Sequence, residues 1–354
     1  VDSLQEAFAF KSWLGERRPL GAISLDLETG EYPGNNTKDA LSPWHGRIRL
    51  LQIGDSETGW AIPWEEWSGV FYETMTNYHG PIICHNIAFE AKWMTTLTKW
   101  KFPWHQAHDT MIMSQVLNPA GQTHALKPLT ARLVDPNAAA AQEMLNKSFH
   151  DNGWTWGTVP TNFQPYWAYG ALDTVITTRL FLEHFWPKLQ PGQSLSTSYE
   201  MEMAVRRVAT TMELNGARVD LEYSQQKYDE LLAYSEKTRV WGLNEFGMSI
   251  TSPIQLARKF EEMGAEITKR TPSGNPSVDK EQLGLFSRSS NPTVALLADA
   301  VLSQRKAEKL ASAYFENFLT RNVDGLLHPE IRTLAARTGR MSITEPALQT
   351  LPSN

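Results

Sequence analysis

Three short segments of the sequence place carboxylates beside apolar elements that could hold them still. The first, 23–29, contains Asp26 and Glu28; the second, 85–90, ends in Glu90; the third, 169–173, ends in Asp173. Together they could bring about four carboxylates to one site, the oxygen-rich set that Mg²⁺ or Mn²⁺ requires. Such a site suits phosphodiester hydrolysis, in which two metal ions about 4 Å apart hold the attacking and leaving oxygens.

Each segment is a weak signal when it stands alone. In a strand, residues two apart point to the same face, so Asp26 and Glu28 would project together and repel unless a cation lies between them. Acidic strand ends are common, however, and a structural role is the ordinary interpretation of a single Asp-x-Glu. Tyr169 and Asp173 would share a helix face, where a half-buried Tyr is equally ordinary. The order and spacing of the three segments therefore carry the prediction.

The 354-residue chain has the composition of a soluble globular protein, with 41% hydrophobic and 20% charged residues. Its length predicts two domains. The single cysteine, Cys84, excludes a disulfide framework and a zinc site, which fits a reducing compartment. No run of about 18 apolar residues occurs, so we expect no membrane span. The net charge of −6 argues only weakly against nucleic acid, because local basic groups matter more than the sum.

The pattern of apolar residues predicts an α/β first half. We expect strands at 22–27, 47–53, 59–62 and 81–84, with 55–58 as a hairpin turn. We expect helices at 63–78, from about Asn86 onward, and at 109–117, 124–133, 137–147 and 164–185. Strands first, then alternating strands and helices, predict a mixed β-sheet flanked by helices.

A stretch rich in Pro, Gly, Ser and Thr at 187–198 is the best linker candidate. After it the sequence predicts helices at 200–215, 221–246, 253–263, 278–288 and 292–320. Ser252 would be the N-cap of the third of these, with Pro253 at its first position. We therefore expect an α/β domain at 1–190 and a mostly α-helical domain at 191–354.

In order and spacing, the three acidic segments resemble the motifs of the 3′–5′ proofreading exonucleases of the ribonuclease H-like superfamily. Those motifs are Asp-x-Glu, Asn-x-x-x-Asp with an aromatic residue before the Asp, and Tyr-x-x-x-Asp. They are matched here by Asp26 and Glu28, by Asn86 with Phe89 and Glu90, and by Tyr169 with Asp173. Asp109-Thr110-Met111, followed by Leu117-Asn118-Pro119, is similar to a further feature of the family. The resemblance covers roughly residues 20–185 and implies a ribonuclease H-like fold.

The resemblance also implies roles for these residues in a two-metal hydrolysis with Mg²⁺ or Mn²⁺. Asp26, Glu28 and Asp173 would hold one ion, and Asp26 with Glu90, through water, would hold the second. Tyr169 would orient the attacking water. The side chains expected to contact the last nucleotides of a frayed, single-stranded DNA 3′ end are Leu27, Thr29, Asn86 and Phe89. Stacking and apolar contacts of this kind accept any base.

The middle segment departs from the family pattern at one position. Glu90 stands where the family usually has Asp. The additional methylene moves the carboxylate by about an ångström, and misplacement on that scale can be costly in rate. An impaired or silent exonuclease is therefore an alternative that the sequence leaves open.

A second set of segments resembles the opening of the polymerase region in family A DNA polymerases, the DNA polymerase I type. These segments are 213–220, 252–256, 269–279, 305–309, 337–342 and 346–352. Ala347 and Thr350 replace two Asn that are usual in the last one. The resemblance implies thumb helices that hold a primer–template duplex through phosphate contacts, which do not read sequence. The candidate residues are Arg305, Lys306, Lys309, Arg337 and Arg340.

The similarity is closest to phage or bacterial enzymes, which implies the cytoplasm of a bacterial cell or a phage-infected host. The sequence ends at Asn354, where the palm and fingers follow in that family, so we expect no primer extension by this chain without a further segment or a separate chain. Two alternatives remain: a stand-alone ribonuclease D-like exonuclease, and a silent scaffold that binds DNA or a replication partner. For the basic group at 305–309, an exposed helix face paired with Glu308 is the rival interpretation.

Overall fold

The computed structural model describes the chain apart from residues 17–20, 99, 122, 337 and 352–354. It divides into two compact units. The first comprises Val1–Asn215 with Ile331–Ser342, and the second comprises Gly216–Glu330 with Ile343–Asn354. The chain thus passes into the second unit after Asn215, beyond the segment 187–198 that the sequence indicated as a linker.

A five-stranded mixed sheet forms the centre of the first unit, with strand order β3-β2-β1-β4-β5. Its strands are β1 (Ile23–Glu31), β2 (Gly46–Gly54), β3 (Gly59–Pro63), β4 (Ile82–Cys84) and β5 (Ala107–Asp109). β1 pairs antiparallel with β2, and β2 pairs antiparallel with β3 through the predicted hairpin turn. β4 pairs parallel with β1, and β5 pairs parallel with β4. The expected mixed sheet is confirmed, although the sequence did not indicate β5.

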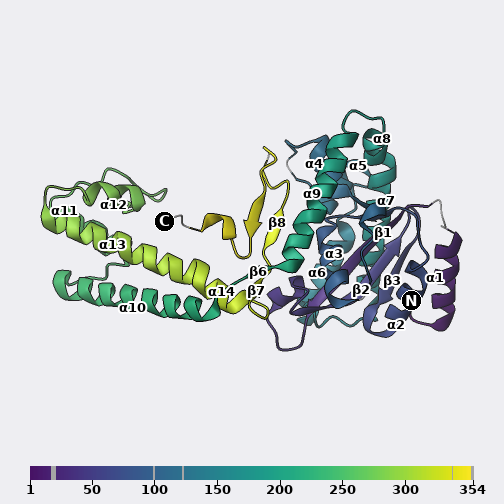
Figure 1. Ribbon diagram of the computed structural model, residues 1–354, viewed down its shortest axis with the longest axis horizontal. Coiled ribbons are helices and arrows are strands. Elements are labelled where there is room, and N and C mark those ends of the chain that lie inside the picture. Colours follow the sequence, from purple (N-terminus) through teal and green to yellow (C-terminus); the bar gives the residue numbers. More distant parts are fainter. Residues whose placement is uncertain (17–20, 99, 122, 337, 352–354) are drawn as a thin grey trace. The chain divides into compact units, whose positions relative to one another are not determined.

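Helices cover both faces of this sheet (Figure 1). They are α1 (Leu4–Glu16), α2 (Trp64–Met75), α3 (Ala88–Leu97), α4 (Thr110–Leu117), α5 (Leu126–Leu133), α6 (Ala140–Asn152), α7 (Gln164–Arg179), α8 (Trp186–Leu189) and α9 (Ser196–Asn215). A π-helical turn, Leu180–Phe185, continues α7. Side chains of α1, α2 and α3 share one core with β1 and β2, whereas Tyr166 and Tyr169 of α7 pack with Leu50 on the other face. The two faces of β1 therefore meet different helices.

Helix α7 lies close against the sheet because small residues remove the side chains that would separate them. A Cβ atom at Gly170 would lie 2.5 Å from Nε2 of Gln52, and one at Gly59 would overlap the main-chain oxygen of Ala171. The Ser24 hydroxyl also donates to the carbonyl of Thr174 at 2.9 Å. These contacts fix the distance between α7 and the sheet.

The second unit is mostly helical, as predicted. Its helices are α10 (Leu221–Phe246), α11 (Pro253–Glu262), α12 (Lys280–Phe286), α13 (Pro292–Leu310) and α14 (Glu316–Arg321), with a π-helical turn at Ala311–Phe315 before α14. Helices α10 and α13 lie side by side and run in opposite directions (Figure 1). Ser252 caps α11, with Pro253 at the first helical position, which confirms both predictions.

The short strands β6 (Ala217–Arg218) and β7 (Leu326–Leu327) pair antiparallel in the second unit. Two others, β8 (Glu330–Arg332) and β9 (Ser342–Thr344), lie where the chain passes from one unit to the other. None of the helices in the described ranges is both long enough and apolar enough to cross a membrane.

Candidate active site

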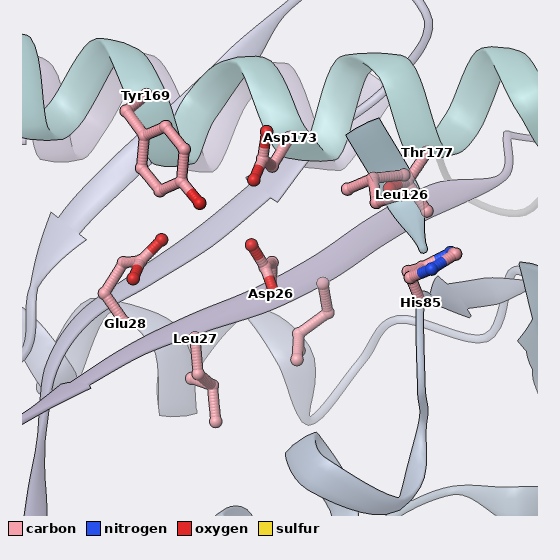
Figure 2. A pocket seen from close by; sticks show the side chains of 9 residues that line it. Asp26, Leu27, Glu28, His85, Leu126, Tyr169, Asp173 and Thr177 are labelled. Carbon is pink, nitrogen blue, oxygen red and sulfur yellow. The ribbon is translucent and has the colours of Figure 1, made fainter. Parts of the chain in front are cut away.

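The first pair of carboxylates lies on β1, on the face that α7 covers (Figure 2). Asp26 and Glu28 are partly buried and line a pocket of about 180 Å³. Their neighbours Leu25 and Leu27 belong to the core on the opposite face, because side chains alternate along a strand. Strand geometry alone therefore brings the two acidic side chains to one place.

The third segment reaches the same pocket from α7. Tyr169 and Asp173 are one helical turn apart, and Figure 2 shows both side chains pointing from α7 toward Asp26 and Glu28. Asp173 is 5% exposed and Tyr169 8% exposed. The complete lining consists of Leu25, Asp26, Leu27, Glu28, His85, Leu126, Tyr169, Asp173 and Thr177.

Glu90 comes from the first turn of α3 and is 1% exposed. Its carboxyl group lies close enough to that of Asp26 for the two to form a side-chain hydrogen bond. The Oε2 atom of Glu90 is buried and has no hydrogen-bond partner. The longer side chain thus brings the middle segment into direct contact with the first.

The loop before α3 is held by Asp109, which caps α4. Its carboxylate accepts hydrogen bonds from the backbone N–H groups of Asn86 at 3.1 Å and Ile87 at 2.9 Å, and from that of Met111 at 2.8 Å. Asn86 adopts a left-handed backbone conformation with φ of 74°, which Asn tolerates better than most residues. Asp109 is therefore a structural support that places α3, and Glu90 with it.

The side chains predicted to contact the last nucleotides differ in their position relative to the carboxylates. Asn86 and Phe89 are half-buried beside Glu90, and the ring of Phe89 lies 5.8 Å from that of Trp93. Leu27 is among the pocket-lining residues, but its side chain points away from the carboxylates (Figure 2). Thr29 is buried outside the lining, and its hydroxyl donates to the carbonyl of Ala40 at 2.5 Å.

Lys127, on α5, is a site residue that the sequence analysis missed. Its ammonium group donates to Oδ1 of Asp173 and lies 4.5 Å from the ring centre of Tyr169. One signal was available, because Lys127 is three residues before the fully buried Thr130 and therefore shares the inward face of its helix. A lysine on an inward face requires an anionic partner.

Burial is the main cause of the pKa shifts at this site. It raises the pKa of Asp26 to about 6 and, with the nearby Asp26 carboxylate, holds the pKa values of Glu28 and Glu90 well above their ordinary range. It lowers the pKa of Lys127 to about 8, against the pull of Asp26 and Glu28. The hydroxyl of Tyr169 also has a raised pKa, first from burial and then from Glu28, so it is neutral at physiological pH.

The donor atoms fit a hard divalent cation. All four acidic side chains offer oxygen, which Mg²⁺ and Mn²⁺ prefer, and Oε2 of Glu90 lacks a partner. A bound cation would also offset the burial that raises these pKa values. In the described part of the chain, no group of three or more Asp, Glu, His or Cys side chains has the arrangement of a metal site. Asp173 forms an ion pair with Lys127 instead.

The basic residues predicted to hold a duplex differ in their surroundings. Arg305 is half-buried and donates to the carbonyl of Val278 at 2.7 Å, so part of its donor capacity serves the fold. Lys306 and Lys309 are exposed on α13, and Arg340 is exposed in the first unit. Arg337 lies outside the described residues.

Known families match both parts of the chain. A family model described as 3′–5′ exonuclease matches residues 3–190, more than half of the sequence. A second, described as DNA polymerase family A, matches residues 220–354. The segment between the two matches contains the whole of α9.

Curated proteins that are similar to this chain are named DNA polymerases. The DNA polymerase of Mycobacterium phage L5 is 26% identical to this chain, over 100% of the chain and 60% of that protein. DNA polymerase I of Aquifex aeolicus is 27% identical, over 86% of the chain and 52% of that protein. The chain thus spans little more than half the length of these relatives.

Among solved structures, the POL domain of Pol1 from M. smegmatis, in complex with DNA primer-template and dNTP, matches with a TM-score of 0.67. The match covers 97% of this chain and 55% of that one, at 21% identity, and shows a shared fold. The sequence motifs, the fold and the family matches agree: the chain belongs to the 3′–5′ exonuclease family, and its residues 220–354 match DNA polymerase family A.

Proposed function

We propose that this chain is the 3′–5′ exodeoxyribonuclease part of a family A DNA polymerase and removes nucleotides from single-stranded or frayed DNA 3′ ends during replication. One observation carries the proposal. Asp26, Glu28 and Asp173 face one pocket, beside the hydroxyl of Tyr169, while Glu90 contacts Asp26 from the first turn of α3. Three separated segments thus supply the acidic groups that phosphodiester hydrolysis with metal ions requires.

The carboxylates would hold two divalent cations, Mg²⁺ or Mn²⁺. Asp26, Glu28 and Asp173 would bind one of them, and Asp26 with Glu90 the other. When bound, such ions make water a strong nucleophile at neutral pH and stabilise the charge on the departing 3′ oxygen. The structure's own contribution is to fix the carboxylates on a strand and two helices, which are more rigid supports than loops.

Tyr169 would orient the water that attacks the phosphorus. Its hydroxyl points into the space above Glu28 and Asp26 (Figure 2). Because its pKa is raised, the phenol keeps its proton and can both donate and accept a hydrogen bond. It therefore suits positioning better than proton abstraction.

The substrate would be a strand end whose last bases are unpaired. Phe89 lies in the first turn of α3 beside Glu90, and Asn86 lies in the loop just before this helix. Phe89 would contact the terminal nucleotide by packing, and Asn86 by hydrogen bonding. Lys306 and Lys309 of the second unit are exposed and would contact the phosphates of a duplex. Arg340, exposed in the first unit, is a further candidate. Such contacts weaken as salt rises.

A polarity assay tests the proposal. Single-stranded oligonucleotides labelled at either the 3′ or the 5′ end would be incubated with the chain and Mg²⁺ or Mn²⁺. We expect immediate release of labelled mononucleotide from the 3′ label and a descending ladder from the 5′ label, with slower attack on a fully paired blunt end. Immediate mononucleotide release from the 5′ label, or no release from either, would overturn the proposal.

A further inference from the structure

A positively charged side chain lies inside the carboxylate cluster. The ammonium group of Lys127 pairs with Oδ1 of Asp173 and lies 4.5 Å from the ring centre of Tyr169. The side chains of Lys127 and Asp173 are 12% and 6% exposed. This ion pair is therefore largely buried. Removal of one partner of a buried ion pair leaves the other charge without compensation.

The position of Lys127 follows from its helix. The neighbouring residues Leu129 and Thr130 are fully buried, so the first turn of α5 cannot shift without opening the core. Leu126, immediately before Lys127, lines the same pocket. From this helix the side chain of Lys127 reaches Asp173 and Tyr169 of α7. It also lies close enough to Asp26 and Glu28 for their charges to raise its pKa.

We propose that the ammonium group of Lys127 occupies the carboxylate of Asp173 in the cation-free site and competes with a divalent cation for it. The inference rests on the proposed function, which brings the cation to these carboxylates. An ammonium group and a divalent cation cannot share one buried carboxylate without strong repulsion. Binding of the cation therefore requires the ammonium to leave Oδ1 of Asp173.

Substituting Lys127 with a neutral residue distinguishes competition with the cation from a purely structural role. If Lys127 only supports the fold, Lys127→Met loosens Asp173 and Tyr169 and weakens cation binding. If Lys127 competes with the cation, its removal leaves a more negative site, and the tightest cation should bind about tenfold more tightly or better. Lys127→Arg keeps the charge and should stay close to the wild type.

The measurement is direct titration of the whole chain with Mn²⁺ in the absence of DNA, with free Mn²⁺ followed by electron paramagnetic resonance. The matched control is Lys147→Met, because Lys147 is exposed on α6 and its loss changes the net charge equally. We expect a lower dissociation constant for Lys127→Met and values within about threefold of the wild type for Lys127→Arg and Lys147→Met. Unchanged or weaker binding by Lys127→Met, or an equal gain in Lys147→Met, would overturn the proposal.

A second measurement uses the wild-type chain and does not depend on the folding of a variant. Lysine acetylation by acetic anhydride, read by peptide mass spectrometry, reports how accessible each ammonium group is. We expect slow modification of Lys127 in EDTA and faster modification when Mn²⁺ saturates the chain, with Lys147 unaffected. Equal modification of Lys127 with and without Mn²⁺ contradicts displacement, and so does a chain that binds no Mn²⁺.

These outcomes are separable from the proposed function. A chain that binds Mn²⁺ in this Lys127-dependent way but releases no nucleotide would keep the inference and overturn the exonuclease. A chain that releases nucleotides from 3′ ends, but whose Mn²⁺ affinity is indifferent to Lys127, would do the reverse.

Discussion

Lys127 of α5 donates a hydrogen bond to Oδ1 of Asp173 of α7, although the two residues are 46 positions apart in the sequence. The contact joins the third acidic segment to an element that has no part in the three motifs. It also places one largely buried positive charge near three carboxyl groups, those of Asp26, Glu28 and Asp173. The chemistry of this site therefore depends on packing between helices as well as on the motifs themselves.

Tyr169→Phe is expected to lower nucleotide release by about ten- to a hundredfold, because it removes the hydroxyl that would orient water. Its effect on stability should be small, since the hydroxyl opens toward the pocket (Figure 2). The measurement is the single-turnover rate of 3′ mononucleotide release. Tyr166→Phe is the matched control: that hydroxyl is buried without a hydrogen-bond partner, so its loss should leave the rate unchanged. Equal rates for wild type and Tyr169→Phe would remove Tyr169 from the mechanism.

Glu90→Asp restores the residue that the related exonucleases usually have. In this chain the carboxyl group of Glu90 reaches Asp26, and shortening the side chain would withdraw it. We therefore expect about tenfold slower nucleotide release for Glu90→Asp, and a larger loss for Glu90→Ala. The rates would be compared at saturating Mg²⁺. A variant faster than the wild type would show instead that Glu90 impairs the site.

The free energy of unfolding should depend on pH through Asp26 when divalent ions are removed by EDTA. Burial raises the folded-state pKa of Asp26 from 3.8 to about 6. The stability that its protonated form contributes is complete below about pH 4 and is lost as the pH rises through about 6. Relative to Asp26→Asn, the wild type should lose on the order of 2–3 kcal/mol between about pH 4 and pH 7. Urea unfolding at several pH values checks this, and a pH-independent difference would contradict it.

Gly59→Ala tests the close packing of α7 on the sheet. The added methyl group would overlap the main-chain oxygen of Ala171, and we expect a loss of about 1–3 kcal/mol in the free energy of unfolding. The control is Gly69→Ala on α2, where a Cβ meets nothing within 4 Å. That change should be neutral or stabilising by up to about 1 kcal/mol. Chemical denaturation of both variants distinguishes them, and equal stabilities would mean that α7 is not held as described.

The parts of the fold that the sequence predicted are those with strong local patterns. The apolar run of β1, the hairpin after β2 and the capped start of α11 all follow from residue type and spacing. Helix α1 has no clean apolar stripe, because Leu4 and Phe8 are exposed while Phe10 and Leu14 are buried, and β5 has only three residues. Neither gives the periodic signal that prediction requires.

The site was predictable as far as each motif lies on a single element. Strand alternation brings Asp26 and Glu28 together, and helical spacing does the same for Tyr169 and Asp173. The contact between Glu90 and Asp26, the capping role of Asp109 and the ion pair of Lys127 all depend on how separate elements pack. Spacing along the chain contains no information about those distances.

The most direct test of the exonuclease site is the double variant Asp26→Ala/Glu28→Ala, measured beside the wild type with a 3′-labelled single-stranded oligonucleotide and Mg²⁺ or Mn²⁺. Glu66→Ala is the control, because Glu66 is exposed on α2 and has no place in the site. We predict that wild type and Glu66→Ala release labelled mononucleotide and that the double variant is slower by at least about a thousandfold. Release by the double variant at the wild-type rate, or no release by the wild type, would contradict the assignment of these carboxylates to an exonuclease.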